Sequence, residues 1–265
     1  MTVLVGVRCS DGVVIGADTA ISYGPVPGQM TLELHQGFKL SILSKQIIVA
    51  STGEVGLAQR FCRVVENRFG DVRSAQKVDA IAAATEVAHL ARNEFDRTRA
   101  PWERQWGLGA LLAMPLQNQP RLVTFDGVNF RPELVGERDG ERFKTLPIVT
   151  MGSGQSQADP FLAHAHRVLF GENHFPTVAE ASLLVAWTID HVIRHSPGGV
   201  GGKLDIATLR KGSDGQWAAS MWAEDEARQA VADIERHIGD YPKALAAARA
   251  PDINAALAEI PVPAA

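Results

Sequence analysis

The stretch MTVLVGVRCSDGVVIGADTA, residues 1–20, decides how the rest of the sequence is interpreted. Two short apolar runs, residues 3–7 and 13–17, flank the turn-forming sequence Ser10-Asp11-Gly12, and this pattern predicts a β-hairpin. The first strand begins almost at residue 2, although chain termini are usually poorly ordered unless they are tied into a sheet. We therefore expect Thr2 to be held rigidly at the start of a strand.

A rigidly held Thr2 has a chemical use. Removal of Met1, which is expected when a small residue follows it, leaves Thr2 with a hydroxyl and a free α-amine on one residue. A threonine hydroxyl needs a base, and the N-terminal amine of the same residue can supply it because its pKa lies near about 8. Met-Thr also begins many proteins that lack such chemistry, so the rest of the sequence has to decide.

The composition is that of an ordinary globular chain. Of its 265 residues, 46% are hydrophobic and 21% are charged, which is enough for one large core. The formal net charge of −4 argues against nucleic acid as a partner. Apolar runs are shorter than the roughly 18 residues of a membrane span, and Arg8 interrupts any signal peptide, so we expect a cytoplasmic protein without membrane contact. Cys9 and Cys62 are expected to be buried thiols rather than a disulfide or a zinc site.

The apolar periodicity predicts blocks of strands and helices in alternation. We expect further strands at 46–50, 108–114, 121–125, 148–151, 204–209 and 216–222, and helices at 54–69, 74–98, 155–169 and 178–194. Val55 falls in the apolar stripe of the first of these helices, and Ala82 and Leu90 fall in that of the second. The charged residues 136–144 are expected to form an exposed loop. This order suits an α+β fold with two sheets face to face and helices on both outer sides, a four-layer αββα sandwich.

Residues 223–265 differ from the rest of the chain. A narrow apolar stripe at helical spacing begins this segment, on Ala227, Ala230, Val231, Ile234 and Ile238. Pro242 is expected to break the helix before a second, alanine-rich helix at 243–250. We therefore predict one domain over residues 1–222 and a C-terminal helical extension over residues 223–265.

An ordered set of short motifs carries a family resemblance. Thr2 and Asp18 are followed by Gly37-Phe38-Lys39-Leu40, Ala50-Ser51-Thr52-Gly53 and Met151-Gly152-Ser153-Gly154. In this order the chain resembles the β-type subunits of proteasomes, which are N-terminal nucleophile hydrolases, and it is most similar to the betaproteobacterial homologues of the bacterial proteasome. The resemblance covers roughly residues 2–222 and implies the four-layer fold.

The resemblance implies a catalytic site of five residues. Thr2 would be the nucleophile and its α-amine the general base. Lys39 would favour the alkoxide and keep the pKa of the amine low, and Asp18 would orient Lys39. The backbone N–H of Gly53 would form the oxyanion hole, and Ser153 would hydrogen-bond near the amine. Taken singly, these residues have ordinary alternatives: an aspartate closing a strand, a lysine in solvent, a glycine starting a helix. The resemblance implies no cofactor and no metal.

Four further residues are implied in substrate binding. Ser22 falls where the family pairs an extended substrate as an added strand. Ile21, Ser51 and Val55 fall at the first specificity pocket, which would be uncharged and prefer small or medium apolar side chains.

One departure from the family pattern concerns the support of the site. The family commonly has an Asp-x-x-Ser motif before the glycine pair that leads into the late strand. Here Gly201-Gly202 is preceded by residues 197–200, Pro-Gly-Gly-Val, without that motif. Either the support is built differently or activity is reduced. His191 and His195, four apart on an expected helix, could share a metal, but surface histidines are the commoner meaning of such a pair.

The leading function is therefore a threonine-type endopeptidase. It would cleave peptides or unfolded protein inside a homo-oligomeric double ring, by resemblance one of heptamers, and the sequence identifies no ATPase partner. Two alternatives stay open: a non-proteolytic hydrolase of small amides or isopeptides with the same fold, and a catalytically weak, ring-forming scaffold.

Overall fold

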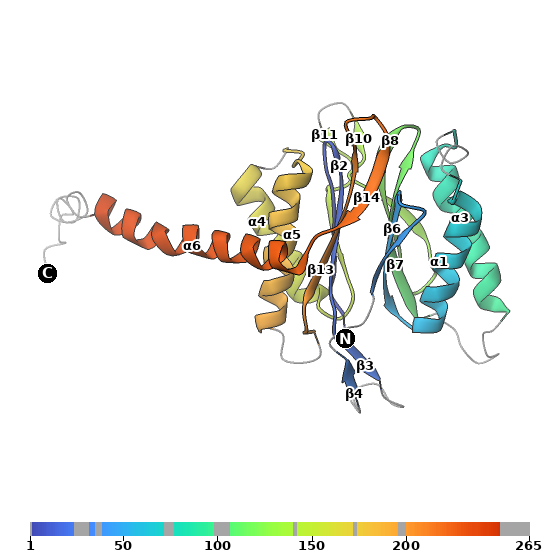
Figure 1. Cartoon of the computed structure of the whole chain (residues 1–265), viewed down its shortest axis with the longest axis horizontal. Coiled ribbons are helices and arrows are strands. Elements are labelled where there is room, and N and C mark those ends of the chain that lie inside the picture. Colours follow the sequence, from blue (N-terminus) through green and yellow to red (C-terminus); the bar gives the residue numbers. More distant parts are fainter. Residues whose placement is uncertain are drawn as a thin grey trace, which may run out of the picture.

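The computed structural model describes residues 2–23, 32–34, 39–71, 77–97, 107–139, 142–171, 174–195 and 200–249. Two five-stranded antiparallel sheets lie face to face, and helices cover the outer face of each (Figure 1). The expected α+β arrangement of two sheets between helices is confirmed.

The first sheet contains the N-terminal hairpin. Its strand order is β12-β1-β2-β13-β14, formed by β12 (Ile148–Met151), β1 (Leu4–Arg8), β2 (Gly12–Asp18), β13 (Leu204–Lys211) and β14 (Trp217–Met221). The hairpin pairs Leu4 with Ala17, as the turn signal predicted. On its other side β1 pairs with β12, so that Leu4 also faces Met151. The start of the chain is thus held by hydrogen bonds on both sides.

The second sheet is a meander. Its strands are β5 (Leu40–Leu43), β6 (Ile47–Gly53), β7 (Leu108–Leu116), β8 (Gln119–Phe125) and β9 (Pro132–Val135), each paired with the next. The expectation that Pro115 and Pro120 lie in the connection between two strands is wrong, because the two residues pair within β7 and β8. Gln117 and Asn118, with φ of 50° and 58°, complete the turn alone, as a two-residue hairpin turn requires.

Two pairs of helices complete the layers. α1 (Val55–Phe69) and α3 (Ala80–Asp96) cover the second sheet, and α4 (Gln155–Phe170) and α5 (Val178–His195) cover the first (Figure 1). The second helix was expected to begin near residue 74. This is wrong, because residues 77–79 are not helical and α3 begins at Ala80. Asp79 caps α3, since its carboxylate accepts bonds from the nitrogens of Ile81 and Ala82 at 3.0 and 3.1 Å. Ala82 and Leu90, expected in the apolar stripe, are consequently exposed.

Three apolar layers fill the spaces between these elements. Because side chains alternate along a strand, Val3 and Val5 face α4 and α5 whereas Leu4 faces the second sheet. Under α1 and α3 lies an aromatic cluster whose ring centroids are 5.0–5.2 Å apart, formed by Phe61, Phe95, Phe125 and Phe130. Both faces of both sheets are therefore buried.

Two short strand pairs stand apart from the main sheets. β3 (Ile21–Tyr23) pairs with β4 (Leu32–Leu34). β10 (Arg138–Asp139) pairs with β11 (Arg142–Phe143), so the expectation of an irregular loop over residues 136–144 is wrong at these positions. Charged residues are compatible with an exposed ribbon, because only the backbone has to pair.

The last described element, α6 (Glu224–Arg249), is a single helix that runs through Pro242. The expected break is therefore wrong: a proline removes one N–H bond from the ladder, and the remaining bonds hold the helix together. Ala227, Ala230 and Val231 are buried at the start of α6, which packs against α5. Further along, α6 projects away from the sheets (Figure 1). Residues 251–265 lie outside the described part, and the domain boundary at residue 222 stays a prediction.

Two expectations from composition can be compared with the structure. Cys9 and Cys62 are both free thiols, so they form no disulfide; Cys9 is buried as expected, whereas Cys62 is half-buried. Burial raises the pKa of each thiol. Among the described residues, no helix has both the length and the apolar character that crossing a membrane requires.

Candidate active site

Thr2 lies directly ahead of β1, enclosed by the turn between β12 and α4. Its side chain is buried, with 8% of the residue exposed. The Thr2 nitrogen donates a 2.9 Å hydrogen bond to Oγ of Ser153, and the Thr2 carbonyl accepts a 3.0 Å bond from the nitrogen of Gly154. Both polar backbone groups of Thr2 are therefore fixed by one turn, and the expected contact between Ser153 and Thr2 is present.

That turn requires a glycine at position 152. Gly152 has a φ of 100°, and a Cβ there would lie 2.4 Å from the carbonyl oxygen of Thr2. Any other residue would be strained by its backbone conformation and would also push Thr2 out of place. The glycine at position 152 thus allows the turn to approach the start of β1 closely.

Asp18, the last residue of β2, is fully buried and bonded at both carboxylate oxygens. Oδ1 accepts hydrogen bonds from the nitrogen of Val3 at 2.9 Å and from Nζ of Lys39 at 2.7 Å. Oδ2 accepts a 3.2 Å bond from the nitrogen of Gly201. The alternative of an aspartate that merely closes a strand is wrong, because this carboxylate joins the N-terminus, the residue before β5 and the segment before β13.

Lys39 is buried beside that carboxylate, with 7% of its side chain exposed. Burial lowers the pKa of Lys39, and the charge and hydrogen bond of Asp18 oppose this shift. The Lys39 carbonyl accepts a 2.9 Å bond from the nitrogen of Ser51, which holds the lysine backbone against β6. A solvent-exposed lysine, the ordinary alternative, is therefore wrong.

Gly53 ends β6 where the chain turns into α1. Its φ is 109°, and a Cβ at this position would lie 1.8 Å from the carbonyl oxygen of Gly107. The following nitrogen, of Glu54, donates a 3.1 Å bond to the same oxygen. Gly53 itself is exposed at this end of the strand.

The four expected substrate residues lie on three segments. Ile21 and Ser22 belong to β3, where they pair with Leu34 and Glu33 of β4. Ser51 lies in β6 and bonds the backbone of Lys39. Val55 is the first residue of α1 and is 44% exposed, so its place in the apolar stripe of that helix, which the periodicity predicted, is wrong.

Support for Asp18 from the segment before β13 is a feature that the sequence did not identify. The nitrogen of Ala20 donates to the carbonyl of Gly201, at 3.1 Å. Thr19 and Lys203 exchange two bonds: Thr19 N to the Lys203 carbonyl at 3.0 Å, and Lys203 N to Thr19 Oγ1 at 2.8 Å. Backbone groups therefore hold Asp18 from a segment that lacks Asp-x-x-Ser. Residues 197–199 lie outside the described part of the chain.

The histidine pair on α5 has a structural explanation. The rings of His191 and His195 are 4.4 Å apart, and His191 stacks on Phe161 at 4.1 Å. In the ranges that the structure describes, no group of three histidine, cysteine, aspartate or glutamate residues is placed to hold a metal. The stacking therefore favours two ordinary helix-surface histidines over a metal site.

Comparison with known families agrees with these observations. Residues 2–192 match the family model described as the proteasome subunit, so the match begins at Thr2 and ends within α5. The chain therefore belongs to the proteasome subunit family. A comparison with curated proteins finds no match.

Proposed function

We propose that the chain is a threonine peptidase in which Thr2 becomes the N-terminal residue after Met1 is removed. One observation carries the proposal: the buried Asp18 carboxylate holds Lys39 and the nitrogen of Val3 on a single oxygen, one residue from Thr2. Ser153 meets the nitrogen of Thr2 from the other side. A hydroxyl, a prospective amine and a buried cation are thus gathered at one strand end.

In the acylation step, the Thr2 amine takes the proton of the Thr2 hydroxyl while Oγ forms a bond to the substrate carbonyl carbon. The carbonyl oxygen becomes an oxyanion, which the N–H of Gly53 stabilises. The intermediate then collapses as the carbon–nitrogen bond breaks. The proton on the Thr2 amine passes to the leaving nitrogen, and the acyl group stays on Oγ as an ester.

In the deacylation step, the freed amine takes a proton from water while the water oxygen adds to the ester carbonyl. Collapse of this second intermediate releases the carboxylic acid and returns the proton to Oγ. Proton uptake and release are then balanced, and the same amine serves as base and acid in both halves.

The roles of Lys39 and Asp18 in this proposal are electrostatic. A lysine ammonium close to Thr2 favours the developing alkoxide and disfavours a second positive charge, which lowers the pKa of the Thr2 amine. Asp18 keeps the ammonium in place, and its own position is supported by the nitrogen of Gly201. This support favours an active site over the catalytically weak alternative.

Substrate would bind as an extended strand along the backbone of Ser22. Ile21, Ser51 and Val55 would line the first specificity pocket, and their uncharged side chains favour small or medium apolar residues in the substrate. The exposure of Val55 supports its availability to a ligand.

Assembly is the second part of the proposal. Proteasome subunits form ring oligomers, and we propose a homo-oligomeric double ring of heptamers like that of the family, in a chain that resembles the betaproteobacterial homologues. Residues 1–222 would form the peptidase domain, and the extension that contains α6 would add a contact or an entrance element to the ring.

An α′,β′-epoxyketone tests the mechanism, because this inhibitor requires both the hydroxyl and the free α-amine of an N-terminal threonine. Intact mass spectrometry should show a chain that begins at Thr2 and carries one inhibitor. Thr2→Ala is the matched control and should stay unmodified. An unmodified wild-type chain that retains Met1 contradicts the proposal.

The two alternatives separate in a second measurement. Turnover of a peptide panel that disappears in Thr2→Ala identifies a peptidase. An epoxyketone adduct without peptide turnover identifies a hydrolase of small amides or isopeptides. Neither an adduct nor turnover, in an intact ring, identifies a scaffold.

A further inference from the structure

A groove runs between α1 and α3 on the outer surface of the second helical layer. Two adjoining cavities of about 560 and 350 Å³ form it, and they share the lining residues Val64, Asn67, Glu94 and Arg97. Because of these shared residues the two cavities are one continuous trough along the helix pair. No part of the mechanism proposed for Thr2 uses this surface.

Arginines dominate the trough. Glu94 serves two of them, since Oε1 lies 3.1 Å from Nη1 of Arg60 and Oε2 lies 2.9 Å from Nη1 of Arg97. Arg68 has a carboxylate of its own, because its Nε and Nη2 bond the two oxygens of Glu86 at 2.7 and 2.9 Å. Among the described residues, two arginines share one glutamate, so this group of three side chains carries a net positive charge.

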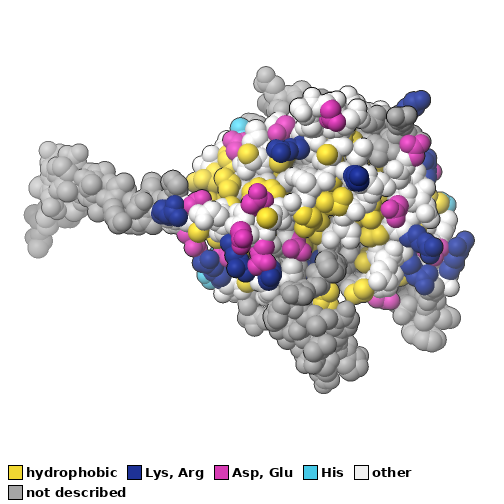
Figure 2. Space-filling view, viewed as in Figure 1, with side chains coloured by type: hydrophobic (Ala, Val, Ile, Leu, Met, Phe, Trp, Pro, Cys, Tyr) yellow, Lys and Arg dark blue, Asp and Glu magenta, His cyan; other side chains and the backbone are white. Residues whose placement is uncertain are grey.

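Arg63 adds a second positive charge, one that no described residue compensates. It lines the larger cavity and is exposed, and within the described part of the chain it forms neither a hydrogen bond nor an ion pair. In the part of the chain that the structure describes, four arginines line the trough and two glutamates pair with them, on a chain whose formal net charge is −4. Figure 2 shows lysine and arginine side chains gathered at the right-hand edge of the molecule, over α1 and α3.

The other lining residues suit a peptide. Gln59, Asn67 and Asn93 bring side-chain amides, which can donate to and accept from a peptide backbone. Leu90 is 36% exposed and, with the half-buried Val64, offers a small apolar contact. The trough thus combines charge, hydrogen-bonding groups and an apolar strip, the mixture found at polar interfaces between proteins.

We propose that this trough binds an acidic, extended peptide segment of a partner polypeptide. Carboxylates of the segment pair with Arg63 and with the spare guanidinium donors of Arg60 and Arg97, because a guanidinium has five N–H groups and Glu94 engages only part of them. The trough is on the surface of one subunit, so the inference is independent of the proposed peptidase activity.

An acidic peptide fits this surface better than a nucleic acid. Glu94 lies between Arg60 and Arg97, and Glu86 is paired with Arg68, so both carboxylates would repel a continuous row of phosphates. None of the lining residues is aromatic, whereas single-stranded nucleic acids are bound by stacking their bases on aromatic rings. The negative charge of the whole chain also disfavours a polyanion.

Fluorescence polarisation tests the proposal with three labelled probes: a ten-residue peptide with four glutamates, the same peptide with glutamines instead, and a ten-nucleotide oligo-dT. The assembled Thr2→Ala protein is used so that a bound peptide is not cleaved. The salt concentration is about 0.1 M, at which surface electrostatics act over about 10 Å. The acidic peptide should bind at least about tenfold more tightly than the glutamine peptide.

Two charge reversals locate the site. Arg63→Glu should weaken binding of the acidic peptide about tenfold or more, because it removes the uncompensated cation and adds a repulsion. The matched control Arg167→Glu reverses an exposed arginine on α4 and should change the affinity less than about twofold. Equal binding of the glutamine peptide, tighter binding of oligo-dT, no effect of Arg63→Glu or no binding at all would each overturn the inference. The epoxyketone adduct at Thr2 is measured separately, so that failure of either proposal leaves the other intact.

Discussion

Nζ of Lys39 lies 2.7 Å from Oδ1 of Asp18, and the two side chains are 7% and 0% exposed. Replacing Asp18 by asparagine removes the charge that compensates Lys39 while the lysine stays buried. We expect Asp18→Asn to lower the free energy of unfolding by about 3–5 kcal/mol, which chemical denaturation measures. Peptide turnover should be lost with it.

The double variant Asp18→Asn/Lys39→Met separates charge from catalysis. An apolar side chain of similar length no longer needs a counter-ion, so much of the lost stability should return. Turnover should not return, because the double variant lacks the cation beside Thr2. If the single and double variants are equally unstable, the ion pair is not the origin of the loss.

Gly53→Ala tests the close approach of Gly53 to Gly107. A methyl group at a φ of 109°, 1.8 Å from a carbonyl oxygen, cannot be accommodated without moving the backbone. We expect a loss of more than about 2 kcal/mol in the free energy of unfolding, measured by urea denaturation. Gly127→Ala is the matched control: no heavy atom lies within 4 Å of its added Cβ, and its stability should stay within about 0.5 kcal/mol of the wild type.

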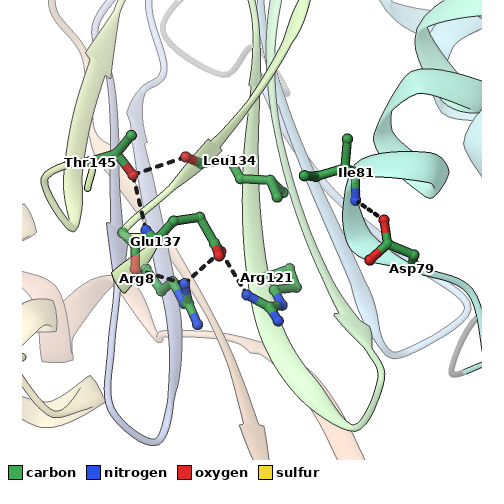
Figure 3. A network of polar contacts seen from close by, with 8 residues as sticks. Arg8, Asp79, Ile81, Arg121, Leu134, Glu137 and Thr145 are labelled. Atoms are coloured by element: carbon green, nitrogen blue, oxygen red, sulfur yellow. Dashed lines mark hydrogen bonds and ion pairs between the residues drawn. The ribbon is translucent and has the colours of Figure 1, made fainter. Parts of the chain in front are cut away.

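Glu137→Gln tests a contact between the two sheets. Glu137 Oε1 accepts bonds from Arg8 of β1 at 2.9 Å and from Arg121 of β8 at 2.6 Å, and Figure 3 shows the carboxylate between the two guanidinium groups. Its backbone nitrogen is held by Oγ1 of Thr145, which in turn donates to the carbonyl of Leu134. Removing the charge makes the two largely buried arginines, 13% and 16% exposed, face a neutral amide in place of a carboxylate.

We expect Glu137→Gln to lower the free energy of unfolding by on the order of 2 kcal/mol. The matched control is Glu133→Gln, which changes an exposed glutamate on β9 and should be neutral within about 0.5 kcal/mol. Because Arg8 and Arg121 belong to different sheets, the loss should appear in global unfolding. Equal stability of the two variants would show that the arginines find other partners.

The sequence predicted the layers well because both sheets are apolar on both faces. β2 and β7 are buried throughout, and β1 is buried except at Arg8, so their hydrophobicity is visible without any knowledge of the strands they pair with. Short elements such as β9 and β10 were missed, since strands of four and two residues are too short to show a clear apolar alternation. The start of α3 was misplaced because the capping aspartate, Asp79, outweighs apolar periodicity upstream of it.

The candidate site was predicted unevenly for a similar reason. Side chains that act through their own chemistry, such as Asp18 and Lys39, were recognisable from motif order. The nitrogen of Gly201 supports Asp18 through the backbone, and a backbone donor leaves no residue type to recognise. Val55 was assigned both to the apolar stripe of α1 and to the first specificity pocket. Its exposure excludes the first assignment, and the second stays a prediction.

His166 makes the stability of the protein depend on pH. The side chain of His166 is buried in α4 beside Phe170. Burial lowers the pKa of His166, and the nearby charge of His174 acts in the same direction, whereas a hydrogen bond with the backbone of His174 opposes the shift. Below the unfolded pKa of about 6.5 the unfolded chain binds more protons than the native one. The free energy of unfolding should therefore be highest above pH 6.5 and fall as the pH drops toward 5.

Urea denaturation across this range should show a weaker pH dependence in His166→Gln than in the wild type. Some dependence should remain in this variant, because burial also lowers the pKa of His191. His164→Gln, at an exposed position of the same helix, should keep the wild-type dependence; an unchanged slope in His166→Gln would place the titrating group elsewhere.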